Sequence, residues 1–292
     1  MRRTAVLLAC AGAALGATPT AATAATPYRV LVFTRTEGFR HASIPAAVSA
    51  LRTVGRSRGF TITATQRPGA FTDASLRRYR AVVFLLTSGN VLDPPQEAAL
   101  QRYVEGGGGF VGVHSAANTE THWAFFGRLI GARFRGHAPF QRALVRVADA
   151  GHPATRGLPR RQRRSDEWYA FTANPRPHVR VLLTVDERTY RPGRFAMGRD
   201  HPIAWSHAVG QGRAFFTALG HARAAYATRS LRRHLGGARG LSSTAAPRHP
   251  VPGGAARRSR EGTARGVIGG SAAVCPGRSP PRPEETRRRP HH

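Results

Sequence analysis

His114 stands at the position in this sequence best suited to chemistry. It follows an apolar run at residues 110–113 and precedes Ser115, with a run of four glycines at 106–109 just upstream. A short β-rich run with such a boundary predicts a buried strand. Ligands of open α/β sheets bind outside the carboxyl ends of the strands. A nucleophile elbow would hold Ser or Cys at this corner, so a histidine there points to proton transfer or metal binding instead.

Two further histidines also follow predicted strands. His221 comes after the run 213–218, and His41 lies between the run 28–34 and a predicted helix. We expect the sheet to bring His41, His114 and His221 to one edge as catalytic residues. They would act as general acids and bases, or jointly hold a divalent metal such as zinc. The alternative is that one or two of them are polar residues with purely structural partners.

Aromatic residues accompany a pair of carboxylates at residues 166–169. Glu167 is the candidate catalytic base or hydroxyl anchor, and Trp168 and Tyr169 are candidates for stacking on a sugar ring. Asp166 is the alternative carboxylate. An exposed acidic turn with Trp168 packed in the core is the structural alternative for the whole segment.

Three more residues are expected to bind substrate. Arg35 and Glu37 occupy the junction between the first predicted strand and the helix that Ser43 begins, and His137 follows a glycine and arginine-rich segment. A helix N-terminus favours an anion or a polar substrate group. The junction lacks the glycine patterns of nucleotide-binding loops, so a nucleotide site is not supported.

Alternating strands and helices must position these residues. Each predicted element is an apolar run or an amphipathic stretch. The strands span 28–34, 60–64, 81–86, 110–114, 143–147, 179–185, 202–206 and 213–218. The helices span 43–58, a short helix around Leu76 with Asp73 as its expected cap, 94–104, 123–130 and 222–235. This rhythm predicts one α/β domain with a mainly parallel sheet over residues 28–235. The glycines at 106–109 precede their strand, so they serve a helix end and a turn at the opposite edge.

Both ends of the chain differ from this domain in composition. Residues 1–25 combine Arg2 and Arg3, an apolar centre and small residues, which predicts a signal peptide and a secreted, extracellular protein with no membrane segment after cleavage. Residues 236–292 are rich in Arg, Pro, Gly and Ala, which predicts a disordered tail; a shifted coding frame would give the same composition. The two cysteines, Cys10 and Cys275, fall in these end segments, so we expect no thiol chemistry in the domain.

The charge of the chain is strongly positive. All 45 basic residues are arginine, and the formal net charge is +30. The arginines are scattered, and no stripe of aromatic residues interleaves with them as in a groove for single-stranded nucleic acid. The cluster at residues 160–164 is expected to be a solvated loop. We therefore expect no nucleic-acid partner, and no feature of the sequence sets an oligomeric state.

Five segments, taken together and in order, resemble the ThuA-like (trehalose utilisation) family. They are Gly38 to Ser43, Gly108 to His114, His152 to Pro159, Asp166 to Tyr169 and Pro202 to His221. The resemblance implies a flavodoxin-like, class I glutamine-amidotransferase-like three-layer sandwich. It also implies a role in the metabolism of trehalose or a related sugar, including 3-keto sugars. His114 stands where a glutaminase needs its nucleophilic cysteine, so glutaminase activity is excluded.

These observations support two hypotheses from different classes. The first is a secreted carbohydrate-active enzyme, a metal-assisted hydrolase or lyase whose ligand is a small carbohydrate. The second is a non-catalytic sugar-binding or interaction module that uses the same cleft. Convergence of His41, His114 and His221 in the folded protein would favour the first, because imidazole nitrogens bind zinc at about 2 Å.

Overall fold

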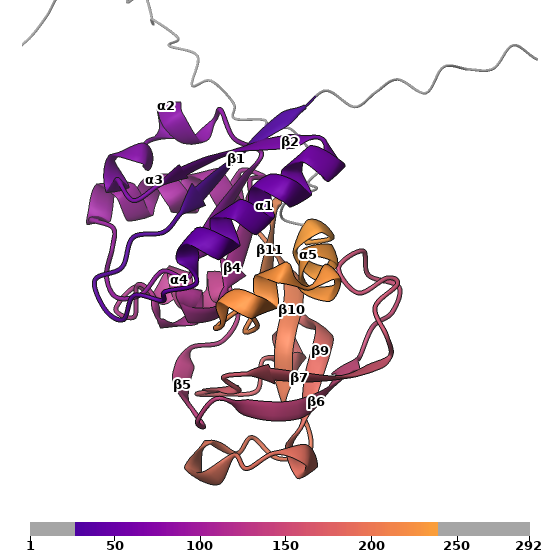
Figure 1. Ribbon diagram of the computed structural model, residues 1–292. Helices are drawn as coiled ribbons and strands as arrows, with labels where there is room; N and C mark the ends of the chain where they lie inside the picture. The colour runs from indigo at the N-terminus through magenta and orange to yellow at the C-terminus, as the bar shows by residue number, and fades with distance from the viewer. Residues whose placement is uncertain (1–26, 239–292) are drawn as a thin grey trace, which may run out of the picture. The chain divides into compact units, whose positions relative to one another are not determined.

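The computed structural model describes residues 27–238 (Figure 1). The expected signal peptide at 1–25, both cysteines and nearly all of the expected tail lie outside the described residues. Within residues 27–238, no helix is long and apolar enough to cross a membrane.

A sheet of nine strands forms the centre of the described part of the chain, in the order β2-β1-β3-β4-β11-β10-β9-β6-β7. Its first five strands pair in parallel, and they are β2 (Phe60–Thr65), β1 (Tyr28–Phe33), β3 (Ala81–Leu85), β4 (Gly109–Val113) and β11 (Gly212–Thr217). Every residue of β3 and β4 is buried, as expected for strands covered on both faces. The strand order reverses at β1, and this is where sheets of this type place their sites.

The sheet continues with four strands in antiparallel pairing. They are β10 (Pro202–Val209), β9 (Arg180–Asp186), β6 (Gln141–Val147) and β7 (Arg161–Asp166). A separate two-stranded sheet joins β5 (Phe134–His137) to β8 (Tyr169–Phe171). The chain thus carries residue 167 between the edge strand β7 and the small sheet, on the same side as the ends of β4 and β11.

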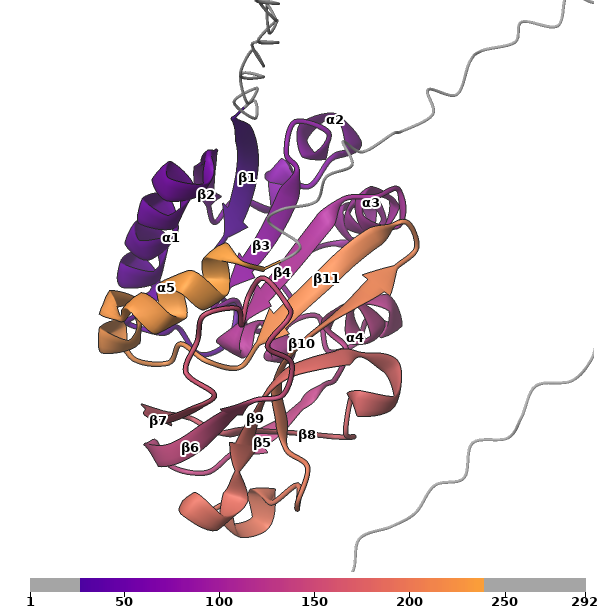
Figure 2. The same ribbon diagram turned by 90° about the vertical axis from the view of Figure 1, so that its right-hand side faces the viewer.

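Helices cover both faces of the parallel half. Helices α1 (Ile44–Arg58) and α5 (Arg229–Gly236) pack together on one face (Figure 2). Helices α2 (Asp73–Leu76), α3 (Pro94–Glu105) and α4 (Ala124–Ile130) lie on the other. Short 3₁₀ turns complete the structure at η1 (Pro68–Ala70), η2 (His114–Asn118), η3 (Arg176–His178), η4 (Glu187–Thr189), η5 (Gly193–Phe195) and η6 (Arg223–Ala227). The expected three-layer α/β sandwich is confirmed.

Three local expectations were wrong. The arginine cluster at 160–164 lies largely in strand β7, whose side chains alternate between more and less exposed; charged side chains on an edge strand also discourage pairing with another chain. The expected last helix is divided into η6 and α5, because Thr228 is extended and caps α5 through the backbone N–H of Leu231. The cap of α2 is Thr72 and not Asp73.

The glycines at 106–109 lie at the end of α3 and the start of β4, as expected. Gly107 has a φ of +110°, which only glycine adopts readily, and Gly106 ends the helix. They stand at the end of β4 opposite to His114, so they turn the chain and do not line the site.

Candidate functional site

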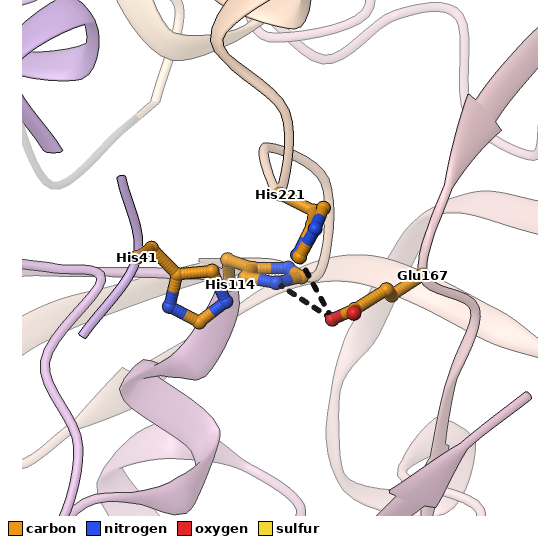
Figure 3. Close-up of side chains that lie close together, drawn as sticks. All are labelled: His41, His114, Glu167 and His221. Carbon is orange, nitrogen blue, oxygen red and sulfur yellow. Dashed lines mark ion pairs between the residues drawn. The ribbon is translucent and has the colours of Figure 1, made fainter. Parts of the chain in front are cut away.

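Four side chains from distant parts of the sequence meet at the carboxyl edge of the sheet. His41 comes from the segment after β1, His114 follows β4, His221 follows β11, and Glu167 follows β7. One ligand atom from each of the four residues lies within 4.8 Å of the others. Figure 3 shows the four side chains pointing toward one another from separate segments. The three histidines expected to converge do so, and the structure adds Glu167 to them.

His114 is fully buried and adopts a strained backbone conformation. Its φ is +54°, the left-handed region that a non-glycine residue seldom occupies, directly after the last residue of β4. A nucleophile elbow also sits on a sharp, strained strand-to-helix turn. The imidazole Nδ1 lies 2.6 Å from the carbonyl oxygen of Ala218, so Nδ1 carries the proton and donates it. The lone pair of Nε2 therefore faces the site.

Glu167 connects the imidazoles. Its Oε2 atom lies 3.1 Å from Nδ1 of His221, 3.4 Å from Nε2 of His114 and 3.6 Å from Nε2 of His137. Burial by itself would raise the pKa of Glu167, but the contacts with His114 and His221 outweigh it and hold that pKa well below its usual range. A carboxylate that stays ionised is a good metal ligand and a weak base, so the geometry favours the ligand role.

His41 and His221 have opposite electrostatic surroundings. Burial, followed by repulsion from His114 and His221, lowers the pKa of His41 to about 3, so its imidazole is neutral at neutral pH. The contact with Glu167 raises the pKa of His221. Although Glu167 is close, the buried Nδ1 of His221 has no hydrogen-bond partner of acceptable geometry within residues 27–238. Its contact in the protein is the ion pair with Oε2 of Glu167 at 3.1 Å.

The two neighbouring carboxylates have separate roles, which the sequence alone left open. Asp166 is buried, and it accepts hydrogen bonds from the backbone N–H groups of Gly220 (2.9 Å), His221 (3.1 Å) and Glu167 (3.1 Å). It therefore fastens the segment that carries His221 to the segment that carries Glu167. Only Glu167 faces the cluster.

Tyr169 and Trp168, both expected to stack on a sugar, are buried. The Tyr169 hydroxyl lies 3.0 Å from Nε2 of His114. Burial, and then the charges of Glu167 and Asp166, raises the pKa of Tyr169 well above its usual value, so the phenol keeps its proton. The Trp168 ring is 1% exposed, and its indole N–H donates to the carbonyl of Gln141 at 3.0 Å. Trp168 therefore packs in the core, which was the structural alternative for this residue. We assign no sugar contact to it.

Of the other residues expected to bind substrate, His137 lies at the site, and Arg35 and Glu37 lie on the surface. His137 adjoins the cluster through Glu167, and its ring stacks on Tyr169 with 5.6 Å between centroids. Arg35 and Glu37 pair with each other on the surface, with 2.7 Å between Nε and Oε1. Neither contacts the four clustered side chains.

A pocket that opens beside the cluster is lined by residues that sequence reasoning missed. It has a volume of about 620 Å³, and its walls include Phe39, Phe140, Ser43 and Arg223 together with His41 and His221. Phe39 is 68% exposed and Phe140 is 47% exposed, and they are the two exposed large apolar side chains within residues 27–238. Phe39 packs against His41 and Phe140 against His221.

Ser43 marks the start of helix α1, as expected, but its side chain does not cap the helix. Its hydroxyl is buried and has no hydrogen-bond partner within the described residues. The pocket therefore offers two aromatic walls, whereas the Ser43 hydroxyl is buried behind its surface. The position of Phe39, two residues before His41, was the sequence signal for this pocket.

The donor set can bind a divalent transition metal. Three imidazole nitrogens and one carboxylate oxygen are ligands that zinc accepts, and imidazole also suits other first-row cations. The bond from His114 to Ala218 is the kind of outer contact that orients a metal-binding histidine. The arrangement can also transfer protons, because His137 and Tyr169 adjoin it.

Comparison with known proteins identifies the relatives of this chain. A family model described as "Trehalose utilisation" (ThuA) matches residues 29–240. A solved ThuA-like protein from Bacteroides uniformis is 24% identical, with 78% of this chain and 96% of that chain covered and a TM-score of 0.65. A second from Parabacteroides merdae is 21% identical, with 78% and 94% covered and a TM-score of 0.60. These two likenesses support the fold alone, and no match was found among the curated proteins.

Proposed function

Because the chain belongs to the trehalose utilisation (ThuA) family, we propose that it is an enzyme that acts on a carbohydrate at a divalent metal centre. His41, His114, Glu167 and His221 hold the metal, and the pocket between Phe39 and Phe140 takes the sugar. The substrate is trehalose or a related sugar, including a 3-keto derivative, and the reaction is a hydrolysis or an elimination.

The convergence of four ligand atoms carries the metal assignment. They lie within 4.8 Å of one another, and Nδ1 of His221 lies 3.1 Å from Oε2 of Glu167 without hydrogen-bond geometry. A bound Zn²⁺ would act as a Lewis acid toward a substrate oxygen. The set fits zinc because the nitrogen atoms of His41 and His114 are available without loss of a proton, given the lowered pKa of His41 and the tautomer of His114.

Tyr169 and His137 are the groups that handle protons. Tyr169 keeps its proton at neutral pH and holds it at the cluster, so it serves as a hydrogen-bond or proton donor. The Nδ1 atom of His137 lies 2.9 Å from the carbonyl of Ala138, which leaves Nε2 as the basic nitrogen on the side of Glu167. His137 is 35% exposed, so it can exchange protons with solvent. Glu167, whose pKa is held well below its usual range, is a weak general base.

The pocket suits a sugar ring. A sugar presents an apolar face of C–H groups, which packs on exposed aromatic rings, and a rim of hydroxyls, which need polar partners. Phe39 and Phe140 provide the rings, and Arg223 and His221 in the pocket wall provide polar groups. The signal segment expected at residues 1–25 supports an activity outside the cytoplasm.

Metal content tests the proposal directly. We expect purified protein to contain or take up one zinc per cluster, and His114→Asn and Glu167→Gln to lose it while remaining folded. Asn tolerates the left-handed backbone of residue 114 better than Ala does. His178→Asn, an exposed histidine, is the matched control and keeps the metal. Equal zinc content in the wild type and both site variants would refute the metal centre.

A non-catalytic sugar-binding module would behave differently in a second assay. Calorimetry with trehalose and its 3-keto derivative measures binding, and product analysis with the metal-loaded protein measures turnover. Binding without turnover by the zinc-loaded wild type would replace the enzyme with the binding module.

A further inference from the structure

A second group of ionisable side chains lies outside the site described above. Glu97 is in the first turn of α3, and Glu120 and His122 are in the segment between η2 and α4. One ligand atom from each of these three residues lies within 4.8 Å of the others. None of the three contributes to the His41 cluster, and the proposed function does not use them.

Glu120 is a carboxylate with one half of its acceptors unused. Its side chain is fully buried. The Oε1 atom accepts hydrogen bonds from the backbone N–H groups of Val91 and Leu92 at 2.7 and 2.8 Å. The Oε2 atom is buried and has no hydrogen-bond partner within residues 27–238. An unpaired, buried carboxylate oxygen is costly, so this atom calls for an additional partner.

Glu97, on helix α3, is also a buried carboxylate with one oxygen that lacks a hydrogen bond. It is 7% exposed, and its Oε1 atom is likewise buried and without a hydrogen-bond partner among the described residues. His122 Nε2 approaches this oxygen to 3.0 Å without hydrogen-bond geometry, and His122 Nδ1 lies 3.9 Å from Oε2 of Glu120. Each of the two buried carboxylates thus has one oxygen without a hydrogen bond, and both of these oxygens lie near the half-exposed imidazole of His122.

The surroundings provide no charge that balances these carboxylates. Within residues 27–238, no arginine side chain pairs with Glu97 or Glu120, although the whole chain has a formal net charge of +30. Two carboxylates this close repel each other when both are ionised, and either a shared proton or a cation relieves the repulsion.

We propose that Glu97, Glu120 and His122 form a second divalent cation site. Two carboxylate oxygens and one imidazole nitrogen suit Zn²⁺ or Mn²⁺, with the remaining positions open to water on the exposed side of His122. Its role is structural: the cation ties the start of α3 to the segment that follows η2. Because η2 begins at His114, the cation stabilises the segment that carries this histidine.

Counting bound zinc separates this site from the first one. The protein is stripped with a chelator, titrated with Zn²⁺ alone and analysed for bound metal by mass spectrometry. We expect two zinc ions in the wild type and one in Glu97→Gln and in Glu120→Gln. Glu105→Gln, an exposed glutamate at the end of α3, is the control and keeps two. His114→Asn also binds one, but at the Glu97 site.

Thermal unfolding gives the second readout. Added Zn²⁺ should raise the melting temperature of His114→Asn by about 5 °C, because only the second site remains to link metal binding to folding. The same addition should leave the double variant His114→Asn/Glu97→Gln unchanged. A shared proton in place of the cation predicts unchanged zinc content in Glu97→Gln, and this result would overturn the proposal. One zinc in the wild type and none in His114→Asn would leave the proposed function standing and remove the second site.

Discussion

The Nδ1 atom of His114 lies 2.6 Å from the carbonyl oxygen of Ala218, and each residue directly follows one of two neighbouring parallel strands. A carbonyl only accepts hydrogen bonds, so this contact determines which nitrogen of His114 is protonated. The other nitrogen, Nε2, faces Glu167 and the Tyr169 hydroxyl. The register between β4 and β11 therefore sets the chemistry available at the site.

Removing the Tyr169 hydroxyl should strengthen metal binding. In the metal-free protein this hydroxyl donates to Nε2 of His114, and a cation at that nitrogen has to displace the bond. We expect Tyr169→Phe to bind Zn²⁺ about fivefold more tightly, which corresponds to a hydrogen bond of about 1 kcal/mol. Titration against a competing chromophoric chelator measures the change. Weaker binding would show that the phenol supports the metal instead of competing with it.

Asp166→Asn should destabilise the protein and weaken metal binding together. The carboxylate accepts three backbone N–H groups, and an amide NH₂ in its place would face a donor. Leaving such groups unsatisfied in the interior costs about 2–3 kcal/mol, measurable by urea unfolding. Asp200→Asn is the control, because its pair with Arg176 is exposed and contributes at most about 1 kcal/mol. An effect of Asp166→Asn no larger than that of the control would contradict the positioning role.

Phe39→Ala and Phe140→Ala should weaken sugar binding and leave stability nearly unchanged. Both side chains are exposed, so truncation should change the free energy of unfolding by less than about 0.5 kcal/mol. Loss of one aromatic contact should raise the Kd for trehalose about fivefold, or about 1 kcal/mol. Calorimetric titration measures binding, and unchanged zinc content shows that the ligands are intact. Trehalose affinity equal to that of the wild type in both variants would exclude these walls from the binding site.

His234 should make the domain sensitive to mild acid. It is fully buried, and burial lowers the pKa of His234 to about 4 from the usual 6.5. Between these values the unfolded chain takes up a proton that the folded protein does not. Stability is thus complete above pH 6.5 and falls as the pH drops toward 4, by about 3 kcal/mol from this residue.

Unfolding of His234→Gln by urea between pH 7 and pH 4 isolates this contribution. The variant should lose about 3 kcal/mol less than the wild type over this range. His41 contributes in the same direction in both proteins, so it cancels in the comparison. His178→Gln, an exposed histidine, should follow the wild-type profile. Parallel profiles for His234→Gln and the wild type would show that His234 does not carry the acid sensitivity.

Much of the fold follows from short-range patterns in the sequence. The buried run before His114, the capped helix from Pro94 and the alternation along residues 28–113 are local properties, and each formed the expected element. Strand β7 did not follow from its sequence, because six mostly polar residues become a strand only through pairing with β6. Strands β5 and β8 are short and likewise depend on each other.

The sequence by itself determined that His41, His114 and His221 share one edge, because parallel strands of a sheet all end there. Only the tertiary structure decided the rest of the site. Glu167 follows the edge strand β7, which lies far from β1 and β4 in the sheet. Asp166 is buried and bonded to the backbone, so only Glu167 faces the histidines. Trp168 and Tyr169 are buried, whereas Phe39 and Phe140 are the exposed aromatic side chains beside the cluster. Burial and pairing between distant segments are not local quantities, so no spacing along the chain encodes them.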